Sequence, residues 1–248
     1  MIRVQKKILF GWFEYEEITR GYFVILFNII CNYGIPEKIK TDNRNSFSSN
    51  KNQVDTTQFG RICKDLSIAL VTTSVPTGKP NVERMNKTVK DRLIAEFRHL
   101  NISTIDDANK YLNNTFIPKM NRKFSYQIDD FTSKMRVNNY SDYELKLIIS
   151  ERYKRIIDNA SSIKYNNIYY IPVDPITGEV ICFSKSTECT FLITYDADYW
   201  CLIEDKYYQL VELKDRSTIM KKEQDNMIQK QPTKYIPPSN HPWRKKLL

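Results

Sequence analysis

The segment that decides the fold is residues 34–43, which read Gly-Ile-Pro-Glu-Lys-Ile-Lys-Thr-Asp-Asn. Before it, residues 16–33 carry apolar side chains on a broad face, and a glycine followed by a nearby proline is a typical helix stop. After it, residues 38–41 alternate in character and lead directly to Asp42. The pattern predicts a helix, a tight turn and a strand that ends in a carboxylate.

Strand and helix patterns alternate on both sides of this segment. The expected strands are residues 7–13, 38–41 and 68–72, and the expected helices are residues 16–33, 57–66, 81–99 and 104–120. Ser103 and Thr104 stand before two aspartates, which is a helix-start signal. This alternation predicts an α/β layer domain over residues 1–125.

The second half of the chain has a different composition. Residues 126–150 read as a linker and a short helix, and residues 214–248 as an extended basic tail. Residues 151–213 are rich in strand formers, with turn signals about every ten residues, which is typical of a small all-β barrel. Its expected strands are residues 165–171, 179–183, 189–193, 199–203 and 207–211.

Composition narrows the class of protein. The 248 residues include 38 Lys and Arg against 29 Asp and Glu, a net charge of +9, and 41% of them are hydrophobic. We therefore expect a folded protein whose leading partner is nucleic acid. The chain has no apolar run of 18 residues, so no membrane partner is expected. Its five cysteines form no CxxC pair, which fits reduced, buried thiols in a cytoplasmic protein associated with the nucleoid.

Two carboxylates stand out, Asp42 at a strand end and Glu83 near a helix start. Such positions can converge on one divalent cation, and oxygen ligands suit Mg²⁺ or Mn²⁺. Simpler interpretations remain open at this point. Asp42 alone could cap a turn, and Glu83 could be a surface acid that is favoured by the helix dipole. The lysines at 79, 87 and 90 could form a solvated helix face.

The words around these acids resemble the second and third acidic motifs of the DDE transposase and retroviral-type integrase family. Residues 34–43 resemble the second of these motifs. Residues 76–87, which read Pro-Thr-Gly-Lys-Pro-Asn-Val-Glu-Arg-Met-Asn-Lys, resemble the third. The family often has a basic residue seven positions after its third acid, and here that residue is Lys90. The likeness covers roughly residues 6–125. Residues 162–170 and 235–244 are similar to the small barrel and tail of a branch of bacterial insertion-sequence transposases.

This resemblance implies an RNase H-like integrase catalytic core followed by an SH3-like barrel. It implies DNA nicking and strand transfer with two Mg²⁺ or Mn²⁺ ions, for which Asp42 and Glu83 would be the catalytic and metal-binding residues. The DNA-binding residues it implies are Asn43, Lys79, Lys87 and Lys90. The partners would be transposon-end and target DNA, together with further copies of the chain or a complementing upstream fragment.

One departure from the family pattern matters. The family has a further Asp on its first strand, whereas no Asp precedes Asp42 here, and the earlier acids are Glu14, Glu16, Glu17 and Glu37. We therefore expect an incomplete core that lacks the first strands, an N-terminally truncated transposase, with the strand at 7–13 left without its natural partner. Two hypotheses follow: a metal-dependent transposase core, or a catalytically inactive DNA-binding remnant that inhibits transposition. An RNase H-like nuclease is a third possibility, and it would need the same absent acid.

Overall fold

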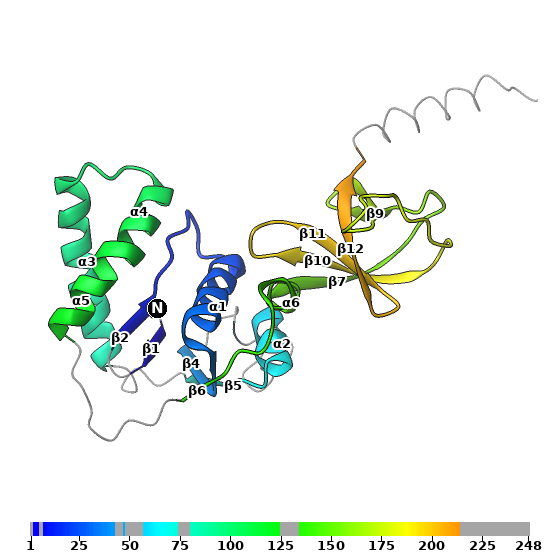
Figure 1. Cartoon of the computed structure of the whole chain (residues 1–248). Coiled ribbons are helices and arrows are strands. Elements are labelled where there is room, and N and C mark those ends of the chain that lie inside the picture. The colour runs from blue at the N-terminus through cyan, green and yellow to red at the C-terminus, as the bar shows by residue number, and fades with distance from the viewer. Residues whose placement is uncertain are drawn as a thin grey trace, which may run out of the picture. The chain divides into compact units, whose positions relative to one another are not determined.

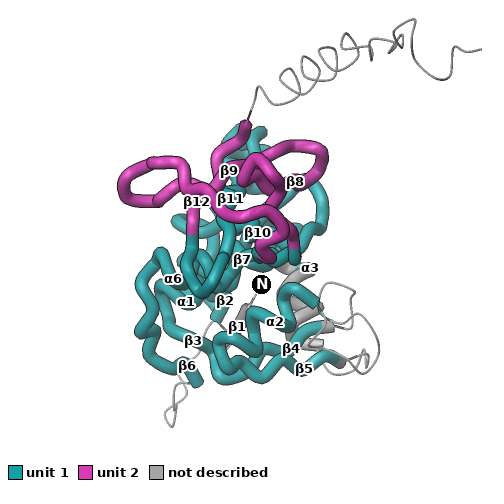
Figure 2. Tube along the Cα trace, turned by 90° about the vertical axis from the view of Figure 1, so that its right-hand side faces the viewer, with its two compact units in different colours: residues 1–154, 189–207 teal, residues 155–188, 208–248 magenta. Residues whose placement is uncertain are grey.

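The computed structural model describes residues 2–4, 7–42, 47, 57–73, 80–124 and 134–213 (Figure 1). The chain divides into two compact units, residues 1–154 with 189–207 and residues 155–188 with 208–248 (Figure 2). The first, unit 1, holds a mixed α/β arrangement, and the second, unit 2, is mainly strands and turns.

Unit 1 begins with an antiparallel hairpin, in which β1 (Ile2–Val4) pairs with β2 (Lys7–Phe10). The strand predicted at residues 7–13 is confirmed as far as Phe10. The expectation that this strand has no partner is wrong, because Ile2–Val4 pairs with it. Ile8 and Leu9 are both buried and, as neighbours on a strand, enter different clusters on opposite faces. Helices therefore cover β2 on both sides.

Helix α1 (Thr19–Tyr33) lies on one of these faces and supports two sheets at once. Its Ile25 and Ile29 pack with Leu9 of β2, whereas its Leu26 and Ile30 enter the cluster that holds Ile39. This broad apolar face explains why the segment is helical, because the side chains at i, i+1, i+4 and i+5 all find apolar partners.

The predicted glycine stop of α1 is confirmed. Gly34 has φ 95°, and its N–H donates to the carbonyl of Ile30 at 2.9 Å. A Cβ at this position would lie 2.3 Å from the carbonyl oxygen of Arg136. Arg136 belongs to β6 (Met135–Arg136), which pairs with β3 (Ile35–Pro36) directly after the stop. Glycine is thus required both for its backbone conformation and for the close approach of β6.

The strand that ends in Asp42 is confirmed as β4 (Lys38–Asp42). It pairs in parallel with β5 (Ala69–Thr73), with Asp42 opposite Thr73. A parallel pair needs a crossover, and α2 (Gln58–Asp65) lies in this connection with Thr57 as its N-cap. Among the strands that the structure describes, β1–β2 and β4–β5 form separate two-stranded sheets.

A helical layer follows. Its elements are α3 (Pro80–His99), α4 (Ile105–Tyr111), the π-helical turn η3 (Leu112–Phe116) and α5 (Ile117–Phe124). The predicted N-cap is confirmed, since the Thr104 hydroxyl accepts the N–H of Asp107 at 3.1 Å. The helix expected to run unbroken from 104 to 120 is instead interrupted by η3.

Three asparagine side chains of this layer hydrogen-bond to the backbone of β2 and of the residues after it, as a neighbouring strand would. The side chain of Asn121 accepts from the N–H of Ile8 at 2.8 Å and donates to its carbonyl at 2.7 Å. Asn113 makes the same pair of bonds with Gly11, and Asn109 with Phe13. A carboxamide carries one donor and one acceptor arranged like a peptide group, so these side chains satisfy the backbone where no neighbouring strand does. We call this set the asparagine clamp.

A six-stranded, barrel-like sheet makes up the remaining described structure (Figure 1). It follows α6 (Asp142–Ile148) and has the strand order β7-β10-β11-β12-β9-β8. The strands are β7 (Ser150–Ile156), β8 (Ile163–Tyr165), β9 (Ile168–Val173), β10 (Glu188–Thr194), β11 (Tyr199–Ile203) and β12 (Lys206–Glu212). The strand predicted at 179–183 is wrong, because Val180 makes only an isolated bridge with Val173.

The β10–β11 hairpin packs on the helices of unit 1 through its tip. The Tyr195 ring lies 4.4 Å from that of Phe27, and its carbonyl accepts from Arg20 at 2.7 Å. Lys146 of α6 pairs with Asp196 at 2.6 Å and Asp198 at 2.5 Å. These contacts place the hairpin in unit 1, although its strands belong to the six-stranded sheet.

Two further expectations can be checked. Cys63, Cys189 and Cys201 are buried as expected, but Cys31 and Cys182 are exposed. In the part of the chain that the structure describes, no helix combines the length and apolar character needed to cross a membrane.

Candidate active site and nucleic-acid interface

The two carboxylates singled out by sequence lie on different elements of unit 1. Asp42 is the last residue of β4, at the end toward which β4 and β5 both run. Glu83 is the fourth residue of α3, within its first turn. The side chains of both lie outside the described part of the structure, so the convergence of the two carboxylates stays a prediction.

Two of the four predicted DNA-binding residues, Asn43 and Lys79, lie outside the described residues. The other two, Lys87 and Lys90, are exposed on α3 and are separated by about one helical turn. The structure therefore leaves both of these ammonium groups available to a large anionic partner.

Helix α3 is held in place by apolar contacts below its lysines. Val89 and Leu93 are buried against Ile8 of β2 and Met120 of α5. The opposite face of β2 packs on α1, which also packs on β4. The helix that carries Glu83 is thus linked, through β2 and then α1, to the strand that ends in Asp42.

Lys90 also lines a cavity of about 410 Å³. The walls come mainly from apolar residues of α3, α1 and the segment after β2, including Phe13, Ile25, Leu93 and Phe97. Among the described residues of this lining, Lys90 is the only charged one, so the cavity places a cation beside an apolar surface.

The carboxylates that precede Asp42 lie off the strands. Glu14 accepts from the indole of Trp12 at 2.9 Å, Glu17 accepts from the hydroxyl of Tyr22, and Glu37 pairs with Lys134 at 3.6 Å. Within the described side chains, no group of three or more His, Cys, Asp or Glu residues could hold a metal ion together.

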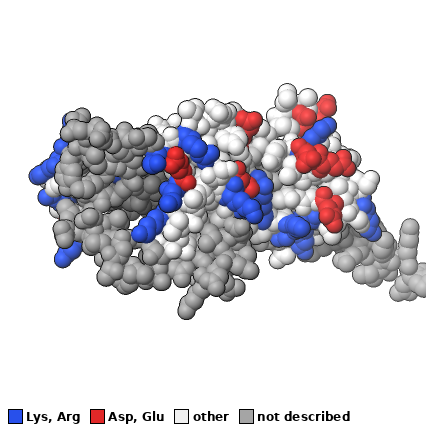
Figure 3. All heavy atoms as spheres, turned by 90° about the horizontal axis from the view of Figure 1, so that it is seen from below, with Lys and Arg blue, Asp and Glu red and all other residues white. Residues whose placement is uncertain are grey.

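Basic side chains outnumber acidic ones in the helical layer. Residues 87–124 contain eight Lys and Arg against four Asp and Glu. Figure 3 shows blue Lys and Arg atoms spread over the face seen there, with acidic atoms interspersed. Positive charge of this kind favours a polyanionic partner.

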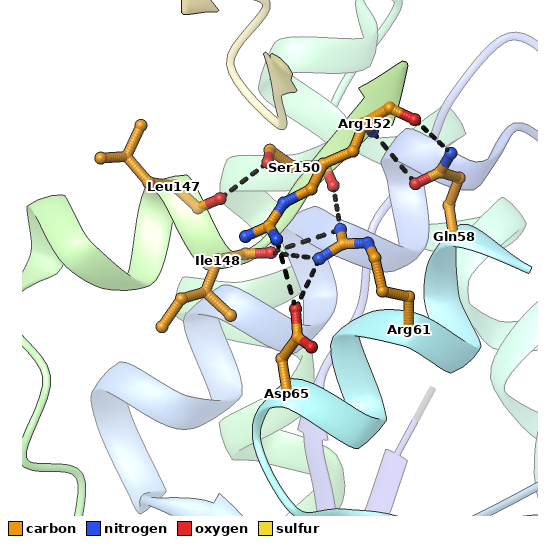
Figure 4. Close-up of polar contacts among 7 residues, drawn as sticks. All are labelled: Gln58, Arg61, Asp65, Leu147, Ile148, Ser150 and Arg152. Atoms are coloured by element: carbon orange, nitrogen blue, oxygen red, sulfur yellow. Dashed lines mark hydrogen bonds and ion pairs between the residues drawn. The ribbon is translucent and has the colours of Figure 1, made fainter. Parts of the chain in front are cut away.

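A partly buried polar cluster that sequence reasoning missed joins α2 to the start of β7 (Figure 4). Arg61 donates to the carbonyls of Ser150 and Ile148 and pairs with Asp65 at 2.7 Å. Arg152 approaches the same carboxylate at 3.7 Å. Burial, and then the nearby charge of Arg152, lower the pKa of Arg61 to about 10.

The same cluster pairs a glutamine with the backbone of β7. Gln58 donates to the carbonyl of Arg152 at 2.9 Å and accepts from its N–H at 3.1 Å, as the asparagine clamp does for β2. Because the guanidinium of Arg61 bonds to backbone carbonyls and to Asp65, we interpret this cluster as a structural joint. The i,i+4 spacing of Arg61 and Asp65 was the only signal visible in the sequence.

Comparison with known proteins gives evidence on the function of the chain that does not depend on the structure. No protein-family model matches the chain. The chain is 34% identical over 248 residues to the transposase for insertion sequence IS1202 of Streptococcus pneumoniae, an alignment that covers 96% of this chain and 51% of the relative. It is 29% identical over 149 residues to the putative transposase y4bF of Sinorhizobium fredii, covering 58% of this chain and 32% of the relative. The chain thus spans about half the length of the first relative, and it is similar over almost all of its own length to the transposase of a bacterial insertion sequence.

Proposed function

We propose that this chain acts in DNA transposition as a DDE-type catalytic core, which nicks DNA at the ends of an insertion sequence and joins those ends to target DNA. The observation that carries the proposal is the placement of Asp42 at the end of a parallel strand pair, within a chain similar to transposases. Glu83 in the first turn of α3 and the two exposed lysines beyond it support the same function. An RNase H-like core is the fold that we infer for this part.

The donor set fits a divalent cation in part. Asp42 and Glu83 would hold Mg²⁺ or Mn²⁺ through carboxylate oxygens, the ligands these ions prefer. When bound, such ions activate an attacking oxygen and stabilise a leaving one in phosphoryl transfer. Two carboxylates make a sparse set for two ions, and three of the acids before Asp42, namely Glu14, Glu17 and Glu37, are engaged elsewhere.

The exposed cations of α3 have a role that does not depend on the metal. Lys87 and Lys90 would contact backbone phosphates and hold the DNA along the helix that bears Glu83. Because Val89 and Leu93 fix α3 on β2, the lysines are presented from a rigid element. Phosphate contacts carry no sequence information, so recognition of particular DNA ends must come from other residues.

A nicking and strand-transfer assay with labelled insertion-sequence ends and Mg²⁺ or Mn²⁺ tests the catalytic proposal. We expect activity that Asp42→Asn and Glu83→Gln each reduce by at least a hundredfold, while Asp91→Asn, an exposed acid of the same helix, leaves it unchanged. Activity that survives Asp42→Asn would remove these carboxylates from the mechanism.

A second candidate function is DNA binding without catalysis, as an inhibitor of transposition. It is favoured by Glu14, Glu17 and Glu37, which lie off the strands and already have partners. In that case the chain shows no nicking, but a gel-shift titration still detects binding that weakens steeply with salt. Salt-independent binding would contradict both candidates, because each relies on phosphate contacts.

A further inference from the structure

The cations of α3 are divided between two sides of the helix. At about 100° per residue, Arg92 lies roughly 200° around the axis from Lys90 and 140° from Lys87. Val89 and Leu93, which are buried in the core, lie in the sector between them on one side. A single rigid duplex that lies along Lys87 and Lys90 would therefore not reach Arg92.

The Arg92 side of α3 forms a common surface with α5. The guanidinium carbon of Arg92 lies 5.0 Å from the centre of the Phe124 ring, and the ammonium of Lys123 lies 5.7 Å from the same centre. Cations at this distance are attracted by the ring. Two cations from two helices are thus held near one another, which lowers the ordering cost of binding a phosphate between them.

The negative charge of Glu96, the acid on this surface, is already balanced by a neighbouring cation. Glu96 accepts from the ammonium of Lys119 at 2.6 Å and from the hydroxyl of Tyr111. These bonds, first that of Lys119, and also the nearby charge of Arg92, lower the pKa of Glu96, so Glu96 stays ionised and offsets one of the positive charges here. Arg92, Lys123 and the exposed Arg122 then remain as an excess of positive charge.

We propose that this α3–α5 surface, defined by Arg92, Lys123 and Phe124, binds a second DNA duplex while Lys87 and Lys90 hold the first. The inference rests on the proposed function, because joining a transposon end to target DNA requires two DNA molecules on one assembly. The contacts are with backbone phosphates, so the second duplex is bound without regard to sequence.

A sandwich assay tests this proposal. A duplex fixed on beads is loaded with the chain, washed, and exposed to a second, fluorescent duplex. Wild type captures the second duplex. We expect Arg92→Gln/Lys123→Gln to bind the first duplex within twofold of wild type but to capture the second at least fivefold less. Lys87→Gln/Lys90→Gln, which removes the cations that hold the first duplex, should instead weaken loading on the bead duplex itself. The quadruple variant loses both steps, and Lys110→Gln, an exposed cation on α4, loses neither.

Salt dependence gives an independent readout. Each phosphate contact contributes about −0.9 to the slope of log affinity against log salt, so Arg92→Gln/Lys123→Gln should make the slope of the capture step less steep by about 2. Phe124→Leu keeps both cations but removes the ring that holds them, and we expect it to weaken capture by a smaller factor. Circular dichroism checks that each variant is folded.

The possible failures are distinguishable. If wild type binds no duplex, the proposed function is wrong and this inference falls with it. If wild type binds one duplex but captures no second, the inference alone is wrong. Capture that persists in Arg92→Gln/Lys123→Gln, with light scattering showing a dimer, would mean that two copies bridge the duplexes through one surface each, and this would also overturn the proposal.

Discussion

Replacing Asn109 by aspartate is the sharpest test of the asparagine clamp. Asn109 is 5% exposed, accepts from the N–H of Phe13 at 2.7 Å and donates to its carbonyl at 3.1 Å. Asn109→Asp preserves the shape and the first bond. It removes the second bond and turns a carboxylate oxygen toward a carbonyl oxygen. Losing the partner of a buried carbonyl costs about 1–3 kcal/mol, and the partly buried charge adds to this.

We therefore expect Asn109→Asp to lower the free energy of unfolding by about 2–4 kcal/mol at pH 7. Urea unfolding followed by circular dichroism measures this difference. The matched control is Asn114→Asp, an exposed asparagine of the adjoining π-helical turn, for which a change within about 0.5 kcal/mol is expected.

The effect should also depend on pH in a defined direction. The folded state raises the pKa of the new carboxyl above its unfolded value of about 3.9, because the protonated form can donate to the Phe13 carbonyl. The loss of stability is therefore absent below about pH 3.9, grows as the pH rises toward the folded pKa, and is complete above it. A variant as stable as the Asn114→Asp control at pH 7 would show that the clamp contributes nothing to folding.

Three further predictions concern other parts of unit 1; the first two are measured by unfolding midpoints, and the third by iodination and by the dependence of stability on pH. Gly34→Ala should lower the stability of the protein more than Gly178→Ala does. Both glycines have positive φ, but only at Gly34 would a Cβ meet backbone, 2.3 Å from the Arg136 carbonyl oxygen. Equal losses of stability would show that β6 moves aside. Arg61→Lys should lose nearly as much stability as Arg61→Met, about 2–4 kcal/mol, because one ammonium group cannot bond to Ser150, Ile148 and Asp65 at the same time. A lysine variant as stable as wild type would contradict this. Lys146→Met should free the β10–β11 tip and make Tyr195 more accessible to iodination. Burial opposes ionisation of Asp196, but the bonds from Lys146 and Thr194 lower its pKa, so its contribution is present above the unfolded pKa and lost as the pH falls through the folded one; an unchanged acid limb in Lys146→Met would refute this pairing.

The elements that sequence predicted correctly are those with local signals. Gly34 stops α1, Thr104 caps α4, and Asp42 ends β4, and each of these was visible within about five residues of chain. The prediction of a strand at 179–183 was wrong. Its apolar run is a local signal, whereas a strand forms only by pairing within the whole sheet, and Val180 makes only an isolated bridge. For the candidate site, the placement of Asp42, Glu83, Lys87 and Lys90 on their elements was predictable, whereas the pairing of Arg92 with α5 depends on its contact with Phe124, 32 residues away.

The asparagine clamp shows how a nonlocal feature can also be encoded by a local irregularity. Asn109 and Asn121 are 12 residues apart, which in a regular α-helix places them about 120° apart around the axis. A π-helical turn accommodates one extra residue and so removes about 100° of that rotation. With η3 between them, both side chains face the same segment: Asn121 pairs with the backbone of Ile8 in β2, and Asn109 pairs with that of Phe13 just after it. The interruption of the helix expected at 104–120 is therefore what allows the clamp to form. Because β2 in turn holds Val89 and Leu93 through Ile8, η3 helps to set where α3 presents Lys87 and Lys90.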